Sequence, residues 1–237
     1  DEVDEDEVDN YKAPSKEDIY NNKERIYAIA DKIVSYCLRS TFKKIKGRGK
    51  AMVKAYSIEA AKMYKDAIDK YLDKQLEDKK YTAYLDTQVF IVYSPNQKHE
   101  SPKALNGNRT EKEVIRDYKN SKNAIIIVVD KLQTGFDEPT LHTLFLDAEI
   151  NDINAVQTVC RVNRTTKFKN DCAVIDFSHN NVNIKNIQKA FKKYEHMSVA
   201  SFDVPGFIES VEKAHTGFKK HALFKILYDK FIETVLD

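Results

Sequence analysis

One stretch decides the fold: Ala124-Ile125-Ile126-Ile127-Val128-Val129 is a run of six apolar residues, five of them β-branched. β-branched side chains favour strands, and a strand without polar alternation is typical of a sheet that is covered on both faces. Parallel sheets have this property because their crossover helices lie on the faces. The stretch therefore predicts an α/β fold built on a parallel sheet.

The flanking sequence repeats an alternation of strands and helices. Strands are predicted at residues 51–56, 88–93, 143–146 and 172–177, and helices at 26–46, 58–72, 110–118 and 153–162. Ser57 stands at a helix N-cap position, and Thr110 with Glu113 forms a capping box. After Asn180 the pattern is helical to the end of the chain. Strands that alternate with helices predict a parallel, doubly covered sheet.

The pattern predicts four parts. We expect an acidic, disordered lead-in at residues 1–15, a linker helix at 16–46, the sheet domain at 47–182 and a helical appendage at 183–237. The lead-in is expected to be disordered because Asp1 to Asp9 holds seven acidic residues and no basic ones. The net charge of +2 therefore hides a basic body, which is compatible with a phosphate-backbone partner.

Several classes of protein are disfavoured. No apolar run approaches the roughly 20 residues that span a bilayer, and no leader peptide opens the chain, so we expect no membrane association and a cytoplasmic location. The first residue is Asp rather than Met, which suggests a fragment or a processed product. Cys37, Cys160 and Cys172 are widely spaced, so neither a disulfide framework nor a zinc site is indicated.

The segment that follows the apolar run, Lys131 to Pro139, carries candidate ligand-binding residues. Ligands of open α/β sheets bind at the carboxyl ends of the strands. Gly135 would let the backbone approach a ligand closely, Thr134 could donate to a phosphate, and Asp137 could accept from a ribose hydroxyl or an arginine. A plain turn capped by Asp137 explains these residues as well.

A second segment shifts the balance towards a nucleotide site. Gln157, Arg161 and Arg164 stand at positions i, i+4 and i+7 of the predicted helix and would share one face. Two arginines on one face repel each other unless an anion or a carboxylate is near. Planar guanidinium groups suit the γ-phosphate of a nucleotide. The alternative, a surface helix with salt bridges, loses weight because the Gly135-x-Asp137 segment precedes this one.

The two segments in this order resemble motifs V and VI of superfamily-two helicases. More narrowly, residues 132–141 followed by 157–164 resemble the restriction (R) subunit of type I restriction–modification enzymes, and the likeness extends over roughly residues 25–195. The resemblance implies a second RecA-like motor domain. Helicases often have Gly before the first arginine of motif VI, and here that residue is Cys160, which leaves the packing at this point open.

The resemblance also implies residue roles. Arg164 corresponds to the arginine finger, Arg161 to a companion that senses the γ-phosphate, and Gln157 to a residue that orients both. Asp137 would contact the ribose or organise the second arginine, and Gly135 would keep its loop close to the nucleotide. Thr134 and Ser57 correspond to positions that grip the phosphates of double-stranded DNA.

The implied function is that of an ATP-dependent DNA translocase and endonuclease subunit. Because the chain contains no Gly-x-x-x-x-Gly-Lys-[Ser/Thr] loop and no Asp-Glu-x-[His/Asp] motif, ATP and Mg²⁺ would be held mainly by an N-terminal motor domain of the same chain. We therefore expect this chain alone to be inactive. The implied partners also include the nuclease domain and the methyltransferase and specificity subunits. The alternatives are the C-terminal domain of another superfamily-two helicase, or a nucleic-acid-binding module that is not coupled to ATP.

Overall fold

Five parallel strands form the central sheet of the computed structural model, which describes residues 14–131, 136–178, 180 and 182–199. The strands are β1 (Lys50–Ala55), β2 (Gln88–Val92), β3 (Ala124–Val128), β4 (Leu141–Asp147) and β5 (Ala173–Asp176). Their order is β2-β3-β1-β4-β5, and each neighbouring pair is parallel. The parallel α/β sheet expected from the apolar run is confirmed.

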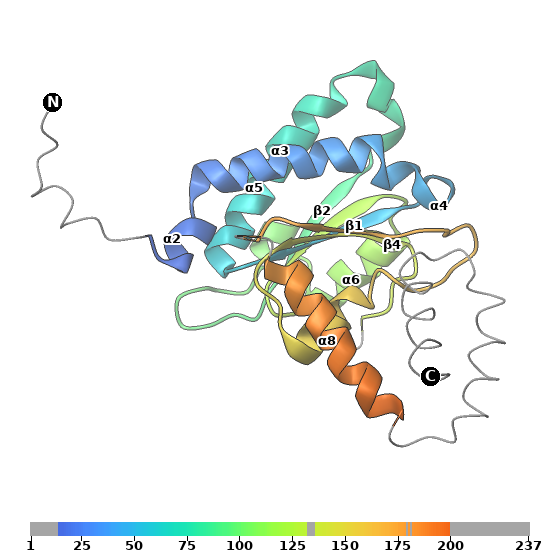
Figure 1. Cartoon of the computed structure of the whole chain (residues 1–237). Helices are drawn as coiled ribbons and strands as arrows, with labels where there is room; N and C mark the ends of the chain where they lie inside the picture. The colour runs from blue at the N-terminus through green and yellow to red at the C-terminus, as the bar shows by residue number, and fades with distance from the viewer. Residues whose placement is uncertain (1–13, 132–135, 179, 181, 200–237) are drawn as a thin grey trace, which may run out of the picture.

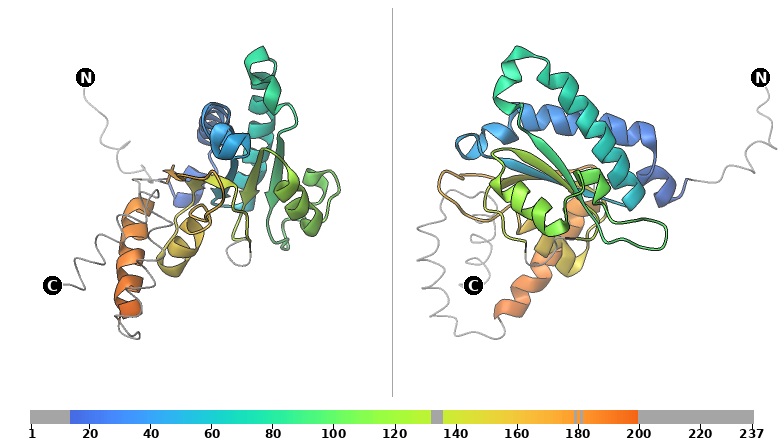
Figure 2. Two further views of the ribbon diagram at one scale, coloured as in Figure 1. Left: turned by 90° about the vertical axis from the view of Figure 1, so that its right-hand side faces the viewer. Right: turned by 180° about the vertical axis from the view of Figure 1, so that it is seen from behind.

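Helices cover both faces of this sheet (Figures 1 and 2). The α-helices are α2 (Lys16–Tyr20), α3 (Lys23–Arg39), α4 (Lys44–Gly47), α5 (Ile58–Leu76), α6 (Glu111–Asn120), α7 (Asp152–Val159) and α8 (Val182–Val199). Three 3₁₀ segments, η1 (Thr41–Lys43), η2 (Lys79–Tyr84) and η3 (Ala104–Asn106), join them.

The core has two halves, one on each side of the sheet. Val53 and Ile127 face a cluster formed with α3 and α5, whereas Met52, Ile126 and Leu144 face a cluster formed with α6 and α7. Met52 lies in register between Ile126 on β3 and Leu144 on β4. Neighbouring residues of a strand point to opposite faces, so a strand buried on both sides must be apolar throughout.

The local helix signals are confirmed. The Ser57 hydroxyl accepts from the Ala60 amide at the start of α5, and Thr110 and Glu113 form a complete capping box at the start of α6. These short polar side chains satisfy amides that have no partner within the helix. The strand positions predicted from the sequence agree with the observed strands to within two residues.

The helix predicted over residues 26–46 is shorter than expected. α3 ends at Arg39, and the chain then turns through η1 into α4, where Ile45 and Lys46 adopt left-handed backbone angles. Beyond the helix end Thr41 is buried, and its hydroxyl lies 2.8 Å from that of Thr143 on β4. α3 itself packs against α5 as a layer of the sheet domain.

Two predicted parts fall outside the description. The acidic lead-in at residues 1–13 and the appendage beyond residue 199 lie outside the described residues. Among the described residues, α8 packs against α7, so the start of the expected appendage contacts the sheet domain. No helix in the described ranges is both long and apolar enough to cross a lipid bilayer.

Candidate nucleotide-responsive site

The two segments singled out in the sequence lie against each other. Arg164 forms an ion pair with Asp137, and Nη1 of Arg161 donates to the Phe136 carbonyl at 2.6 Å. The side chain of Arg164 is 37% exposed and that of Asp137 is 61% exposed, whereas Arg161 is only 6% exposed. The two arginines therefore differ: one is buried against the backbone, and the other is accessible to a ligand.

The expected helical face does not form. α7 ends at Val159, and the next amides tighten to i−3 partners: Arg161 donates to Thr158 and Val162 to Val159. Such a turn changes the angular spacing of side chains, so Arg161 and Arg164 do not continue the face of Gln157. The prediction that all three residues share one helical face is wrong. Asp137 brings Arg164 to the site instead, through the ion pair.

The location of Asp137 also differs from the expected one. Its segment begins after β3, at the carboxyl edge of the sheet, but it returns to the amino-terminal edge, where β4 starts at Leu141. Ser57 follows β1 at the opposite edge. A strand as long as β1 separates the two edges by roughly 17 Å. Asp137 and Ser57, to which the resemblance gives a nucleotide role and a DNA role, therefore belong to different edges.

A buried ion pair fixes the residue that follows Asp137. Glu138 accepts from Nζ of Lys50 at 3.1 Å, and the same ammonium group donates to the Lys119 carbonyl at 2.7 Å. Glu138 also accepts from the amide of Thr140 at 3.0 Å. Burial lowers the pKa of Lys50, and the charge of Glu138 opposes this shift. A buried charge that has good partners constrains geometry more than it adds stability.

A second buried lysine holds the end of the segment. Nζ of Lys169 donates to the Pro139 and Leu141 carbonyls at 3.1 and 2.6 Å. Burial lowers the pKa of this ammonium group from 10.5 to about 8. Three cations thus hold the segment from Phe136 to Leu141: Arg161 and Lys169 through backbone carbonyls, and Lys50 through the Glu138 carboxylate. Sequence reasoning missed both lysines, since lysine on its own predicts a solvated surface.

Burial and a like charge act on the arginines together. Burial lowers the pKa of Arg161, and the nearby charge of Arg164 lowers it further. An anion placed between the two guanidinium groups would relieve this repulsion. The pair of arginines expected from the sequence is therefore close enough to interact, although it does not lie on a helix.

The remaining predicted residues are placed as follows. Gln157 is half-buried on α7. The Ser57 hydroxyl donates to Oδ1 of Asn21 at 2.5 Å while it caps α5. Gly135 and Thr134 lie outside the described residues. Across the described ranges there is no group of three or more His, Cys, Asp or Glu side chains that could hold a metal ion.

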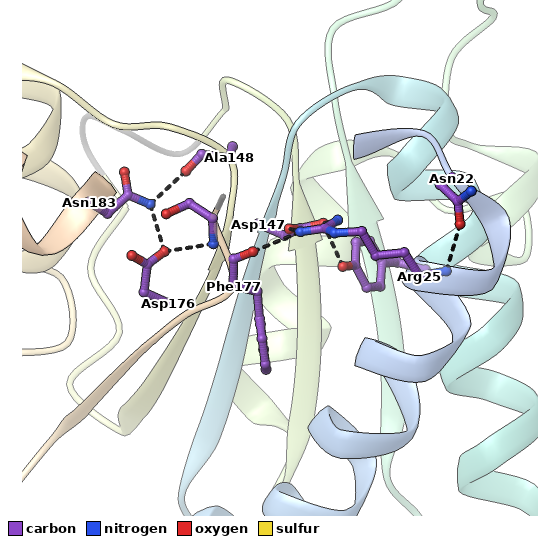
Figure 3. Close-up of polar contacts among 9 residues, drawn as sticks. Asn22, Arg25, Asp147, Ala148, Asp176, Phe177 and Asn183 are labelled. Carbon is purple, nitrogen blue, oxygen red and sulfur yellow. Dashed lines mark hydrogen bonds and ion pairs between the residues drawn. The ribbon is translucent and has the colours of Figure 1, made fainter. Parts of the chain in front are cut away.

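A polar cluster at the carboxyl edge was also not predicted (Figure 3). Arg25 on α3 forms a two-pronged ion pair with the buried Asp147 at the end of β4, and it also donates to the Phe177 carbonyl. Beside this pair, the amide of Asn183 donates to Asp176 and to the Ala148 carbonyl. The cluster ties α3 and α8 to the ends of β4 and β5.

The fold and the site together define a class. A five-stranded parallel sheet with helices on both faces is the RecA-like fold that was expected from the sequence. A solved fragment of an HsdR subunit of a type I restriction enzyme from Vibrio vulnificus YJ016 has the same fold, with a TM-score of 0.51 at 16% identity, and the match covers 76% of this chain and 31% of that one.

The sequence comparisons narrow the likeness. Residues 112–179, which hold both arginines and Asp137, match the family model for domain 3 of the type I restriction enzyme subunit R. In Methanocaldococcus jannaschii, the MjaVIIIP endonuclease subunit, named as part of a type I restriction enzyme, is 32% identical over 155 residues, covering 61% of this chain and 15% of that protein. The MjaVIIP subunit is 32% identical over 139 residues, covering 54% and 13%. The resemblance to type I R subunits is confirmed, and the chain spans only a small part of these relatives' length.

Proposed function

We propose that this chain supplies the arginine-bearing half of an ATP site in the DNA-translocating R subunit of a type I restriction enzyme. The observation that carries the proposal is the joining of the two segments: Asp137 pairs with Arg164 while Phe136, one residue earlier, accepts from Arg161. The likeness of residues 112–179 to R-subunit domain 3 supports the assignment.

In this proposal the two arginines have separate roles. Arg164 is the exposed one, so its guanidinium can exchange Asp137 for the γ-phosphate and stabilise the charge that develops during phosphoryl transfer. Arg161 acts as a positioning residue, because its guanidinium is buried on the Phe136 carbonyl. Asp137 holds the Arg164 side chain in place until the phosphate binds.

The rest of the site belongs to other parts of the proposed assembly. These 237 residues contain no phosphate loop. A motor domain that precedes them in the full-length subunit would therefore bind most of the ATP and its Mg²⁺. Ser57 would contact the phosphates of double-stranded DNA from the carboxyl edge, and Thr134, which lies outside the described residues, is proposed for the same role. The nuclease domain, the methyltransferase subunit and the specificity subunit complete the proposed complex.

The test is a substitution in the full-length subunit. We expect Arg164→Ala to lower the turnover number for DNA-stimulated ATP hydrolysis by about 10³-fold or more, because that is the usual contribution of an arginine finger. Nucleotide binding should change little, since most contacts lie in the other domain. Steady-state ATPase kinetics and equilibrium binding of a fluorescent ATP analogue measure the two effects.

Arg116→Ala is the matched control, because Arg116 is an exposed arginine on α6 that pairs with Asp117. It should leave turnover intact. Unchanged turnover in Arg164→Ala would contradict the proposal and favour a nucleic-acid-binding module that is not coupled to ATP. In the same assay, the 237-residue chain alone should show no Arg164-dependent hydrolysis.

A further inference from the structure

The amino-terminal edge of the sheet carries a concentration of positive charge. Three segments lead into strands there: residues 40–49 before β1, 119–123 before β3 and 165–172 before β5. Together they contain eight basic residues and one acidic residue, Asp171. Asp171 is already paired with Lys44 and lies 3.1 Å from Nε2 of His142. The charge of these three segments is therefore almost wholly positive, whereas the segments before β2 and β4 at the same edge carry acidic residues, among them Asp137 and Glu138.

Contacts across the segments show that they form one surface. Nζ of Lys46 lies 3.7 Å from the ring centroid of Phe168, and Nζ of Lys167 lies 5.2 Å from the same centroid. The Lys122 side chain lies beside Gly47, where a Cβ would be in van der Waals contact with it at 3.8 Å. Figures 1 and 2 show α4 and the loop between α7 and β5 reaching to the same end of the sheet.

The surface extends towards the candidate nucleotide site. Arg48 and Lys119 both act on the buried ammonium group of Lys50, and each lowers its pKa. Nζ of Lys119 lies 6.0 Å from the ring centroid of Phe136, the residue whose carbonyl receives Arg161. We call the exposed side chains of Lys46, Arg48, Lys119, Lys122 and Lys167 the basic edge.

The backbone beneath the basic edge is built to hold an unfavourable conformation. Ile45 and Lys46 have φ values of 54° and 53°, which L-residues other than Asn and Asp rarely adopt. The buried Asn123 amide holds this turn, with its nitrogen 3.1 Å from the carbonyl oxygens of Gly47 and Gly49. At Gly49 a Cβ would lie 1.9 Å from the Thr41 carbonyl oxygen, so the chain passes too closely for any other residue. A strained turn that is held this firmly presents Lys46 and Arg48 in a fixed arrangement.

We propose that the basic edge is a contact surface for the phosphate backbone of a nucleic acid, separate from the carboxyl edge. Protein–DNA interfaces are polar and strongly positive, whereas protein–protein interfaces are depleted of lysine and have an apolar core. Phe168 is the large apolar side chain here, 46% exposed, and two lysines lie against its ring. The contact is independent of sequence, because ammonium and guanidinium groups on phosphates position a duplex without reading its bases.

The surface shares a loop with the candidate ATP site. The chain from Arg164 to Lys167 joins the exposed guanidinium to the basic edge, and Lys169 anchors the same loop to Pro139 and Leu141. A phosphate backbone held at Lys167 therefore lies on the segment that positions Arg164. The inference does not depend on ATP hydrolysis, because the contact requires only the charges of this chain.

The experiment measures binding of a short fluorescein-labelled DNA duplex to the 237-residue chain by fluorescence anisotropy over a range of salt concentrations. We expect the triple variant Lys46→Gln, Arg48→Gln, Lys122→Gln to bind about tenfold or more weakly at about 50 mM salt. The slope of log affinity against log salt should become shallower by about 2.7, which is about 0.9 for each lost phosphate contact. A second duplex of unrelated sequence should show the same losses.

The matched control removes three exposed lysines from α3, α6 and α8: Lys32→Gln, Lys112→Gln and Lys185→Gln. This variant should keep a slope near that of the wild type, and circular dichroism should show that both variants are folded. A slope unchanged by the first triple substitution, or lowered equally by the control, overturns the proposal. Polyglutamate that binds as tightly as DNA, with the same loss in the first variant, also overturns it, because the surface would then fit an acidic protein.

Discussion

At the scale of single residues, Lys169 is a buried cation whose charge state depends on the fold. It is 5% exposed, and its ammonium group donates to the carbonyl oxygens of Pro139 and Leu141. Burial therefore lowers its pKa to about 8, against an ordinary value of 10.5. Between these two values the unfolded chain binds more protons at this position than the folded chain does, so stability rises with pH.

The prediction concerns the pH dependence of unfolding. Between pH 8 and pH 10, we expect the free energy of unfolding of the wild type to increase by about 2 kcal/mol relative to Lys169→Met. Below about pH 7 the difference should be constant, because Lys169 is then charged in both states. Urea unfolding of both proteins at a series of pH values measures this difference. A difference that stays flat up to pH 10 would show that Lys169 titrates normally in the folded protein.

At the scale of secondary-structure elements, one side chain forms hydrogen bonds with the free backbone groups of the edge strand β2. The amide of Asn106 accepts from the Ile91 amide at 3.0 Å and donates to the Ile91 carbonyl at 2.8 Å. It thus supplies the pairing that a further strand would give. Unpaired edges invite association with other chains, so this amide also protects the sheet.

Replacing this amide should be costly. We expect Asn106→Ala to lower the free energy of unfolding by about 2–3 kcal/mol, because two buried backbone groups lose their partner. Asn120→Ala is the matched control, since Asn120 is an exposed asparagine at the end of α6, and it should change stability by less than about 0.5 kcal/mol. Chemical denaturation gives both values, and equal effects would show that the Ile91 contacts contribute nothing.

Elements whose signals are local could be predicted, whereas those set by distant contacts could not. The apolar run at residues 124–129 predicts a strand from a few neighbouring residues, and β3 forms there. In the same way Ser57 predicts the start of a helix, and α5 begins directly after it. The helical spacing of Arg161 and Arg164 is equally local but misleading. There the Phe136 carbonyl, 25 residues away, receives Arg161 beyond the end of α7.

At the scale of the whole molecule, the Arg25–Asp147 ion pair joins the first helical layer to the sheet. Asp147 is fully buried and also accepts from the Tyr64 hydroxyl at 2.6 Å. The sequence gives no sign of this pair, because 122 residues separate its partners. This is why the helix at residues 16–46 was expected to be a linker rather than part of the core.

Breaking this pair should weaken the whole domain. We expect Arg25→Met to lower the free energy of unfolding by about 3–5 kcal/mol, because a buried carboxylate then loses its cation. Arg39→Met, at the exposed end of α3, should change it by less than about 1 kcal/mol. Equilibrium unfolding in urea compares them, and a small loss in Arg25→Met would mean that Asp147 is stabilised by Tyr64 or becomes protonated.

The position of Arg25 also affects how the chain must be made. Its guanidinium rests on the Phe177 carbonyl, 152 residues further along the chain. A ribosome that adds about 5–20 residues per second needs roughly 8–30 s to cover that interval. Throughout this time the Arg25 guanidinium lacks its Phe177 partner, although β1 and α5, which cover the apolar face of α3, follow that helix directly in the chain. The layer of α3 and α5 can therefore form early in synthesis, whereas the contact that joins Arg25 to the end of β5 is among the last to be made.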